Sequence, residues 1–426
     1  MTDQPLDIWL LQTGEQLPVE SESRRLRTRL LADELAGRGH RVTWWASTFN
    51  HMRKEACFTG DTTFSPYAGL TITAIHGIGY GRNMSLRRLV HHRITTRKFR
   101  KAVAQASSPD VIVASYPPHD LAEAAVAFAR QRRIPVVVDI RDKWPDIFED
   151  TLPRALRPIG HWVLIDDYAR RNRAMTGADA LVSMTEPLLD WGLSHAGRTR
   201  GNQDRVFYLG SYREAQPTPS PELAKIIATR LKGRVVITFM GQFASSSDPS
   251  VAIDVAARMV DDPRLVFVLA GDGDLGPSLR EKAHDLPNVV FTGWLESEGI
   301  AALLHNSSLG LATTGRRGEL NFLPNKVFNY LSAGVPVASM FHGELQHLID
   351  HNGFGFNFSN SDELLTRLSA FANSPDQRIS MAARAREFFD QQGDAGTIYA
   401  CYADFVEDLA KSGNGPRTIP NNGGSN

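Results

Sequence analysis

Cysteine is scarce in this chain of 426 residues, which contains only Cys57 and Cys401. The two lie far apart and no Cys-x-x-Cys pair is present, so neither a disulfide framework nor a thiolate zinc site is expected. No apolar run reaches the ~18 residues that a membrane span needs. The N-terminus also lacks the basic start and apolar run of a signal peptide. These absences favour a cytoplasmic protein.

An excess charge of one sign is missing too, because 47 Lys and Arg balance 47 Asp and Glu. Nucleic acid is therefore not expected as a partner, and any basic surface must be local. The composition, 42% hydrophobic and 22% charged, is that of a globular protein. At about 100–200 residues per domain, the length predicts two or three domains.

Strand and helix patterns alternate along the first half of the chain. The run Val136–Val138 has no polar alternation, which is typical of a central parallel strand covered on both faces. Strands are expected at 6–11, 41–45, 70–75, 111–114, 136–140, 180–184 and 206–209, and helices at 22–38, 86–106, 119–132, 159–176 and 187–195.

A polar stretch with three prolines, residues 212–221, predicts a linker, and the alternation then restarts. Strands are expected at 235–239, 265–269, 289–291, 309–312 and 336–338, and helices at 249–261, 275–285, 297–305 and 325–333. The predicted fold is α/β, with two Rossmann-like doubly wound domains. The predicted divisions are 1–212, 222–390, a C-terminal helix over 391–412, and a disordered tail over 413–426.

Ligands of open parallel sheets bind beyond the carboxyl ends of the strands, so the loops there are the candidate sites. Gly241 and Gln242 open a hydroxyl-rich loop that either binds phosphate or forms a turn capped by Asp248. Gly271 and Gly273 either admit a ligand or simply make a turn.

The next strand end carries Thr292 and Gly293, which either face a base or ribose or end an ordinary buried strand. Asn325 and Lys326 follow Pro324 at an expected helix start, where the helix dipole disfavours a cation. A bound phosphate would compensate the charge of Lys326; the alternative is a solvated lysine.

Five short motifs in a fixed order resemble the retaining glycosyltransferases of the GT-B class, family 4. They are Gly39–Val42, Ala270–Gly273, Asn288–Gly293, Leu323–Lys326 and Gly334–Val337. The resemblance implies a central cleft between two domains, with the acceptor in the first and a nucleotide-sugar donor in the second. It also implies that no metal and no cofactor is needed, because basic side chains and helix dipoles neutralise the leaving diphosphate.

The chain departs from the family at two glutamates that usually stand eight positions apart, where it has Asn321 and Asn329. An amide carbonyl still accepts hydrogen bonds from a ribose, but without charge. Glu319 is an alternative acceptor. The Arg and Lys common after the first strand of the second domain are also missing, which leaves Lys326, helped by Arg316 or Arg317, as the expected diphosphate ligand.

The segment Asp139–Asp146 resembles an Arg-Asp-x-Trp-Pro motif of bacterial relatives that build surface polysaccharides. In that interpretation Arg141 orients a phosphate or sugar and Asp142 accepts the proton of the acceptor hydroxyl. The alternative is an Arg–Asp pair that closes its own loop. Gly14, Glu22 and Arg25 are further candidates on the acceptor side.

Residues 82–101 combine basic and apolar side chains, which predicts either a helix on an anionic membrane or a basic surface helix packed on the sheet. The first would suit a lipid-linked acceptor and a peripheral location at the inner face of the membrane.

Three functions remain open from the sequence: a glycosyltransferase of surface polysaccharide synthesis, a catalytically silent relative that binds nucleotide or glycan, and a nucleotide-sugar epimerase. A nicotinamide dehydrogenase is not expected, because the turn after the first strand, residues 12–16, lacks Gly-x-Gly-x-x-Gly spacing.

Overall fold

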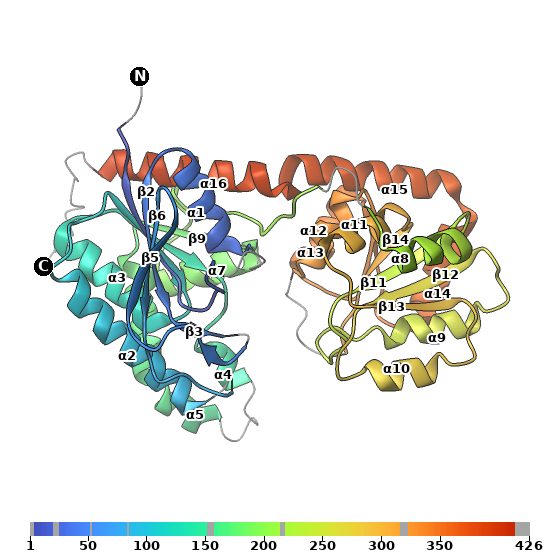
Figure 1. The fold of residues 1–426 in the computed structure, drawn as a ribbon, viewed down its shortest axis with the longest axis horizontal. Helices are drawn as coiled ribbons and strands as arrows, with labels where there is room; N and C mark the ends of the chain where they lie inside the picture. Colours follow the sequence, from blue (N-terminus) through green and yellow to red (C-terminus); the bar gives the residue numbers. More distant parts are fainter. Residues whose placement is uncertain are drawn as a thin grey trace, which may run out of the picture. The chain divides into compact units, whose positions relative to one another are not determined.

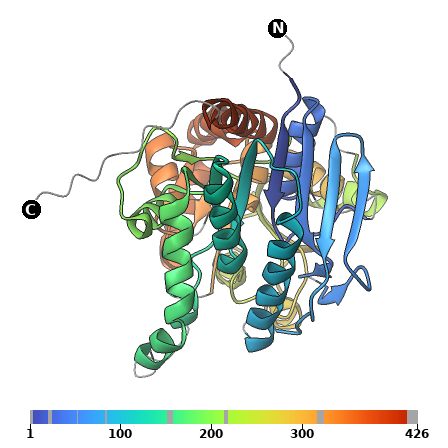
Figure 2. The same ribbon diagram turned by 90° about the vertical axis from the view of Figure 1, so that its left-hand side faces the viewer.

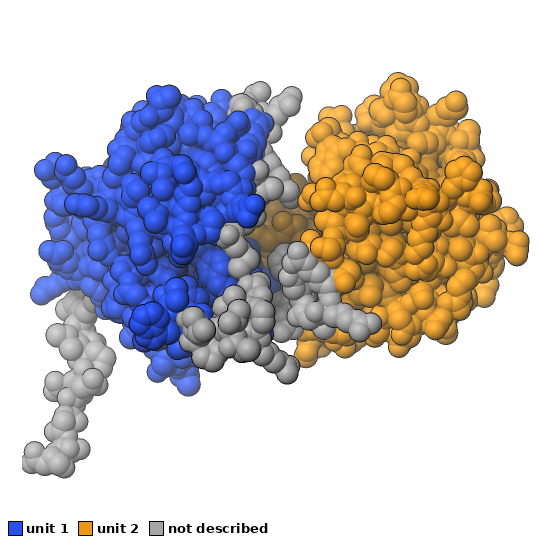
Figure 3. All heavy atoms as spheres, turned by 90° about the horizontal axis from the view of Figure 1, so that it is seen from below, with its two compact units in different colours: residues 1–207, 399–426 blue, residues 208–398 orange. Residues whose placement is uncertain are grey.

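The computed structural model describes residues 4–19, 25–51, 53–82, 85–150, 157–213, 218–315 and 323–413. The chain forms two compact units, residues 1–207 with 399–426 and residues 208–398 (Figures 1 and 3). The boundary between the two units thus falls after Phe207, before the predicted linker. The last helix, α16 (Ala395–Gly413), begins in unit 2 and continues in unit 1. The predicted tail lies outside the described residues apart from Gly413.

Unit 1 is built on a sheet that, in the described residues, has eight strands in the order β10-β9-β8-β7-β1-β2-β6-β5. All neighbours pair in parallel except β5, which runs antiparallel to β6 at the edge. The strands are β1 (Asp7–Leu11), β2 (Arg41–Ser47), β5 (Thr62–Tyr67), β6 (Leu70–Ile75), β7 (Val111–Tyr116), β8 (Val136–Ile140), β9 (Ala180–Ser183) and β10 (Arg205–Val206), with a small hairpin of β3 (Phe49–Asn50) and β4 (Glu55–Ala56).

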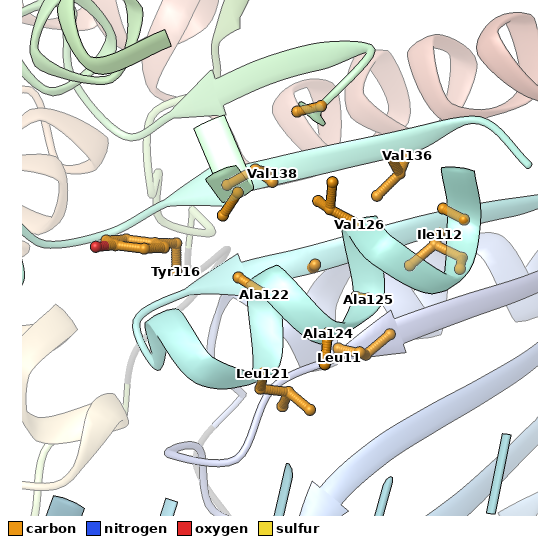
Figure 4. Packing of buried hydrophobic residues seen from close by; sticks show 14 of the residues in the cluster. Leu11, Ile112, Tyr116, Leu121, Ala122, Ala124, Ala125, Val126, Val136 and Val138 are labelled. Atoms are coloured by element: carbon orange, nitrogen blue, oxygen red, sulfur yellow. The ribbon is translucent and has the colours of Figure 1, made fainter. Parts of the chain in front are cut away.

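Helices cover the sheet of unit 1 because its central strands are apolar on both faces. Helix α3 lies on one face, where its alanines let it approach β7 and β8 closely; α1 contacts β2 and β6 (Figure 2). The helices are α1 (Arg27–Gly37), α2 (Leu86–Val103), α3 (His119–Arg132), α4 (Asp146–Asp150), α5 (Arg157–Val163), α6 (Ile165–Gly177) and α7 (Glu186–Ala196). Figure 4 shows this packing for Leu11, Ile112, Tyr116, Leu121, Ala122, Ala124, Ala125, Val126, Val136 and Val138.

Two expectations for unit 1 are wrong in detail. The helix expected over 159–176 is two helices, α5 and α6, which meet at Leu164. The strand expected over 206–209 is shorter and earlier, because β10 pairs with β9 only at Arg205 and Val206.

Unit 2 has a parallel sheet with the order β13-β12-β11-β14-β15-β16, six strands among the described residues. Side chains alternate along β12: Val266 and Val268 belong to one core and Leu265 and Phe267 to the other. The strands are β11 (Val235–Met240), β12 (Leu265–Ala270), β13 (Val289–Gly293), β14 (Leu309–Ala312), β15 (Val337–Ser339) and β16 (Gly355–Asn357).

Both faces of this sheet are covered by helices. One core includes α11, α12, α13 and α15, and the other α9, α10 and α14. The helices are α8 (Pro221–Ile226), α9 (Ser250–Arg258), α10 (Gly276–Lys282), α11 (Ser297–His305), α12 (Lys326–Ser332), α13 (Glu344–Asn352), α14 (Ser361–Asn373) and α15 (Pro375–Phe388), with π-helical turns η2 (Ile227–Leu231) and η3 (Phe389–Gly393). Across the described ranges, no helix combines the length and the apolar character needed to cross a bilayer.

Tyr330 ties α12 to the sheet of unit 2. Its ring lies against Gly310 of β14, where an added Cβ would come within 2.4 Å of it. Its hydroxyl accepts a hydrogen bond from the Met240 amide and donates one to the Leu311 carbonyl, each 3.1 Å long. One fully buried side chain therefore sets the position of α12 against β11 and β14.

We expect Tyr330→Phe to destabilise unit 2 by about 1–3 kcal/mol, because the Met240 amide loses its partner in a dry core. Urea unfolding followed by circular dichroism measures the change. The control is Tyr212→Phe, whose side chain is 49% exposed. An equal, negligible effect of both substitutions would contradict this account of Tyr330.

Candidate functional site

Two loops with glycines pack directly on each other at the carboxyl edge of the sheet of unit 2. They follow β11 and β12, which are neighbours in the sheet. The Gly241 amide donates to the Ala270 carbonyl over 2.9 Å, and a Cβ on Gly271 would lie only 1.9 Å from the Gly241 carbonyl oxygen. Gly241 and Gly271 have φ of 130° and 143°. Only glycine fits Gly271, because both the space and the backbone conformation exclude a side chain.

The same packing explains why residue 273 is a glycine, since a Cβ there would lie 2.5 Å from the Phe243 carbonyl oxygen. The buried Phe243 is held by backbone hydrogen bonds to Asp272 and Leu275. The close packing of the two turns is thus enough to explain Gly271 and Gly273 without a ligand. Gln242 is exposed beside them at the edge where a ligand would bind.

The third predicted loop joins the same edge. The Gly271 amide donates to the Gly293 carbonyl over 2.8 Å, and Thr292 donates its hydroxyl to the same carbonyl over 3.1 Å. Gly293 has φ of 71° with open space where a Cβ would stand. The structure thus brings Gly241, Gly271 and Gly293 together on adjacent strands.

Lys326 lies next to this edge as the first residue of α12. Its Nζ donates to the Ser247 hydroxyl over 2.8 Å and lies 3.9 Å from the centre of the Phe239 ring. It also lies beside Gly241, where a Cβ would be 3.3 Å from Nζ. Within the part of the chain that the structure describes, no carboxylate forms an ion pair with Lys326. Burial lowers its pKa to about 7.

The desolvated amine of Lys326 is therefore an incomplete site on its own. A buried ammonium is stable only when an opposite charge compensates for its lost hydration. A phosphate beside the Gly241 loop would supply that charge. The Lys326 side chain is partly buried, and the desolvation of its amine favours the phosphate interpretation over a fully solvated lysine.

Of the four polar residues near α12 that are predicted to bind the donor, two lie within the described residues. Asn325 precedes the helix, is exposed and makes no capping hydrogen bond through its side chain. Asn329 lies one turn later, and its Oδ1 accepts from the Ser211 hydroxyl over 2.6 Å. Glu319 and Asn321 lie outside the described residues, as do the suggested helpers Arg316 and Arg317.

At the carboxyl edge of the sheet of unit 1, Arg141 belongs to a buried network of charges. It follows β8 and donates to Asp139 over 3.0 Å and to the Thr28 hydroxyl over 2.9 Å, and it forms an ion pair with Glu15. Arg27 holds the same Asp139 at 2.9 Å. Burial alone would raise the pKa of Asp139, but the two guanidinium groups outweigh it and hold that pKa below its usual value.

Asp142, the next residue but one after β8, is only partly buried. Its carboxylate accepts from the Lys143 amide over 2.8 Å. Burial raises its pKa, while hydrogen bonds from the Lys143 amide and the Trp144 side chain, and then the charge of Arg88, oppose this shift. Arg88 is stacked over the Trp144 ring, 4.2 Å from its centre. A carboxylate with a raised pKa is a better proton acceptor than an ordinary aspartate.

The other candidates for the acceptor side make fewer side-chain contacts or lie outside the described residues. Gly14 is exposed, and its amide donates to the Gln12 side chain over 2.7 Å. Arg25 lies before α1, with its Nε 3.9 Å from Asp33. Glu22 lies outside the described residues.

The sequence interpretation missed Glu15, Arg27, Phe239 and Ser247, which hold the predicted Arg141 and Lys326. The sequence contains a signal for Arg27, because this charged residue lies beside Leu26 and Leu30 on the apolar face of the expected helix. A charge in that position indicates a buried partner. Ser247 gave no signal that separates it from the neighbouring serines.

Both units match family models of glycosyltransferases. Residues 25–201 match the glycosyl transferase 4-like domain, and residues 234–373 match the glycosyl transferases group 1 model. Unit 1 and unit 2 thus each match one glycosyltransferase domain model, and each has a Rossmann-like parallel sheet.

Solved structures with this fold cover nearly the whole chain. Anabaena HepE in complex with UDP has a TM-score of 0.63 at 15% identity, covering 95% of this chain and 100% of that one. The Escherichia coli trehalose-6-phosphate protein bound to UDP-2-fluoro glucose has a TM-score of 0.66 at 13% identity, with 95% and 99% covered. At such identities the likeness shows the fold alone.

Curated relatives match over shorter segments. The UDP-glycosyltransferase TURAN of Arabidopsis thaliana is 30% identical over 151 residues, 34% of this chain and 32% of that protein. The human chitobiosyldiphosphodolichol beta-mannosyltransferase is 33% identical over 118 residues, 27% of this chain and 25% of that protein. The chain thus spans about a third or less of the length of these relatives.

We expect Gly271→Ala to destabilise unit 2 by several kcal/mol, since both the clash with Gly241 and the φ of 143° oppose a side chain. Gly299→Ala in α11 is the matched control and is expected to be neutral or stabilising by up to ~1 kcal/mol. Thermal unfolding of the two variants compares them. A Gly271→Ala variant as stable as the Gly299→Ala variant would contradict the proposed contact between the loops.

Proposed function

We propose that this protein is a glycosyltransferase that moves a sugar from a nucleoside-diphosphate donor to a glycan or lipid-linked acceptor. The observation that carries the proposal is Lys326, a partly buried lysine with a desolvated amine and no carboxylate partner among the described residues, beside the Gly241 loop. Matching domains in both units support it, as do UDP complexes of proteins with this fold.

In the proposed reaction, unit 2 binds the diphosphate of the donor. Gly241, Gln242, Gly271 and Gly273 form its phosphate side, and Thr292 and Gly293 lie further along the same edge. As the bond to the sugar breaks, negative charge grows on the leaving diphosphate, and a protonated Lys326 stabilises it. Asn325 and Asn329, with Glu319 or Asn321, would contact the ribose and sugar.

We propose that a bound metal is not required, because Lys326 supplies positive charge where the diphosphate leaves. Activity measured in excess EDTA tests this. We further propose transfer with retention, in which the acceptor oxygen attacks the anomeric carbon on the face that the diphosphate leaves. The anomeric configuration of the product, read by NMR, decides between retention and inversion.

Unit 1 is proposed to bind the acceptor. Asp142 takes the proton of the attacking hydroxyl, and Arg141 orients a phosphate or sugar through its remaining exposed edge. Gly14, Arg25 and Glu22 are proposed at the border of this site. Activity in surface polysaccharide synthesis would require a glycan or lipid-linked acceptor of this kind.

Nucleotide binding should take up a proton above pH 7. The pKa of Lys326 is about 7, so about nine-tenths of the amine is neutral at pH 8 in the absence of ligand. A bound phosphate raises that pKa and favours the ammonium. Affinity for UDP should therefore fall as the pH rises from 7 to 9, by up to about tenfold per unit.

Calorimetry at pH 8 in buffers of different ionisation enthalpy measures this proton uptake. Lys326→Met should weaken UDP binding by about tenfold or more and abolish the uptake. Lys326→Arg is the matched control, because arginine stays charged at this pH and the variant should bind UDP without taking up a proton. If Lys326→Met bound UDP, GDP, dTDP and ADP as the wild type does, Lys326 would not be the diphosphate ligand.

Asp142→Asn should lower kcat by about 10²–10⁴-fold with little change in nucleotide affinity, because the amide cannot accept the proton. Released nucleoside diphosphate, assayed with a panel of nucleotide sugars and acceptors, measures the rate. Asp146→Asn is not a suitable control, because Asp146 pairs with Arg171. Asp261→Asn is the better one, since Asp261 is exposed in the loop between α9 and β12, away from the carboxyl edge of the sheet. An unchanged kcat in Asp142→Asn would remove Asp142 from the mechanism.

A second candidate is a catalytically silent protein that binds nucleotide or glycan. It is favoured by Asn329, whose carbonyl is already engaged by Ser211 where the family it resembles usually has a glutamate. Nucleotide binding without turnover of any donor, in the wild type and in Asn329→Glu, would support this candidate. Donor consumed without acceptor would instead indicate an epimerase or hydrolase.

A further inference from the structure

Unit 1 exposes large apolar side chains at one end of its helices. On α2, Leu86 is 76% and Val90 44% exposed. On α5 and α6, Trp162 is 75%, Val163 58% and Ile165 60% exposed. We call these five residues the apolar end.

The two parts of the apolar end belong to helices on either side of α3, which packs against both α2 and α6. Arg93 of α2 forms an ion pair with Asp167 of α6, 3.7 Å apart. Val90 lies about one turn before Arg93, and Ile165 lies two residues before Asp167, so both flank this contact. Figures 1 and 2 show the start of α2 and helix α5 at the same end of unit 1.

The rest of α2 corrects the expectation of an amphipathic helix lying along a membrane. Phe99 and Val103, further along the helix, are buried against unit 1. Only its first turns present apolar side chains outward. The helix therefore contributes an end, not a whole face, to any membrane contact.

Positive charge follows the apolar end along α2. The helix carries seven Arg and Lys residues and no Asp or Glu. Arg87, Arg97 and Lys101 are exposed, and the Arg87 guanidinium also donates to the carbonyls of Ile78 and Gly79. Three other basic residues of the helix are paired with acids: Arg93 with Asp167, Lys98 with Asp61 and Arg100 with Glu123. Asp166, the exposed acid next to Ile165, is paired with Arg170 over 2.7 Å. Apolar side chains bordered by arginines match the acyl and headgroup layers of an anionic bilayer.

We propose that unit 1 docks on an anionic lipid bilayer, with the apolar end in the acyl–headgroup boundary and the basic side chains of α2 against the headgroups. Trp162 has an amphipathic ring that favours this boundary. A second copy of the chain fits less well, because a twofold contact through α2 would bring like charges together. The proposal rests on the proposed function, since docking would bring unit 1 to a lipid-linked acceptor.

Co-sedimentation of the full chain with phosphatidylcholine vesicles, with and without phosphatidylglycerol, tests the proposal. The wild type should bind the anionic vesicles and be released by salt. Trp162→Ser with Val163→Ser should weaken binding by about tenfold or more, because two apolar anchors are lost. Ile379→Ser in unit 2, whose side chain is 69% exposed, is the matched control and should bind as the wild type does.

Arg87→Gln with Arg97→Gln should reduce binding to anionic vesicles and its dependence on salt. UDP affinity, a property of unit 2, should be unchanged in every variant, which separates this test from that of the proposed function. An unchanged circular dichroism spectrum and thermal midpoint confirm that unit 1 is folded. The proposal is overturned if the wild type ignores both vesicles, if the Trp162 and Val163 variant binds as well as the wild type, or if these substitutions instead dissociate a dimer in size-exclusion chromatography.

Discussion

The cost of removing charge from water shapes both candidate edges of this protein. In unit 1 the cost is offset internally, because Arg27 and Arg141 share the buried Asp139 and Arg141 also meets Glu15. In unit 2, Lys326 has a hydroxyl and an aromatic ring but no carboxylate among the described residues. The first arrangement is complete without a ligand. The second would gain from an anion, and this asymmetry is the reason why we propose the diphosphate site in unit 2.

The buried network of unit 1 also limits what Arg141 can do. Two carboxylates and a hydroxyl already occupy most of its guanidinium donors. Only 14% of the Arg141 side chain is exposed, so in the proposed mechanism its larger effect would be to fix the segment after β8 and not to bind substrate. In the proposed mechanism Asp142, whose carboxylate accepts from the Lys143 amide, would need little reorganisation before it accepts a proton.

The sequence predicted those features that have a local pattern. Buried apolar runs such as Val136–Ile140 and glycine-terminated helices gave the alternating elements and the two parallel sheets. The antiparallel edge strand β5 was not predicted, because none of its residues is buried and its partner is set by the turn at Gly69. Pairs such as Arg27 with Asp139, or Ser247 with Lys326, join residues far apart in the chain and leave no local periodicity.

The asparagine at position 329 has a consequence for Lys326 itself. A glutamate there would stand three residues after Lys326 on the same helix, close enough to pair with its ammonium. Such a pair would raise the lysine pKa and partly satisfy its charge before any ligand arrives. Asn329 removes that competitor and turns its carbonyl to Ser211. An asparagine in place of a ribose-binding carboxylate would thus go together with a lysine that depends more on phosphate. In the proposed donor complex, the diphosphate would then contribute more of the binding free energy, and the ribose and sugar less.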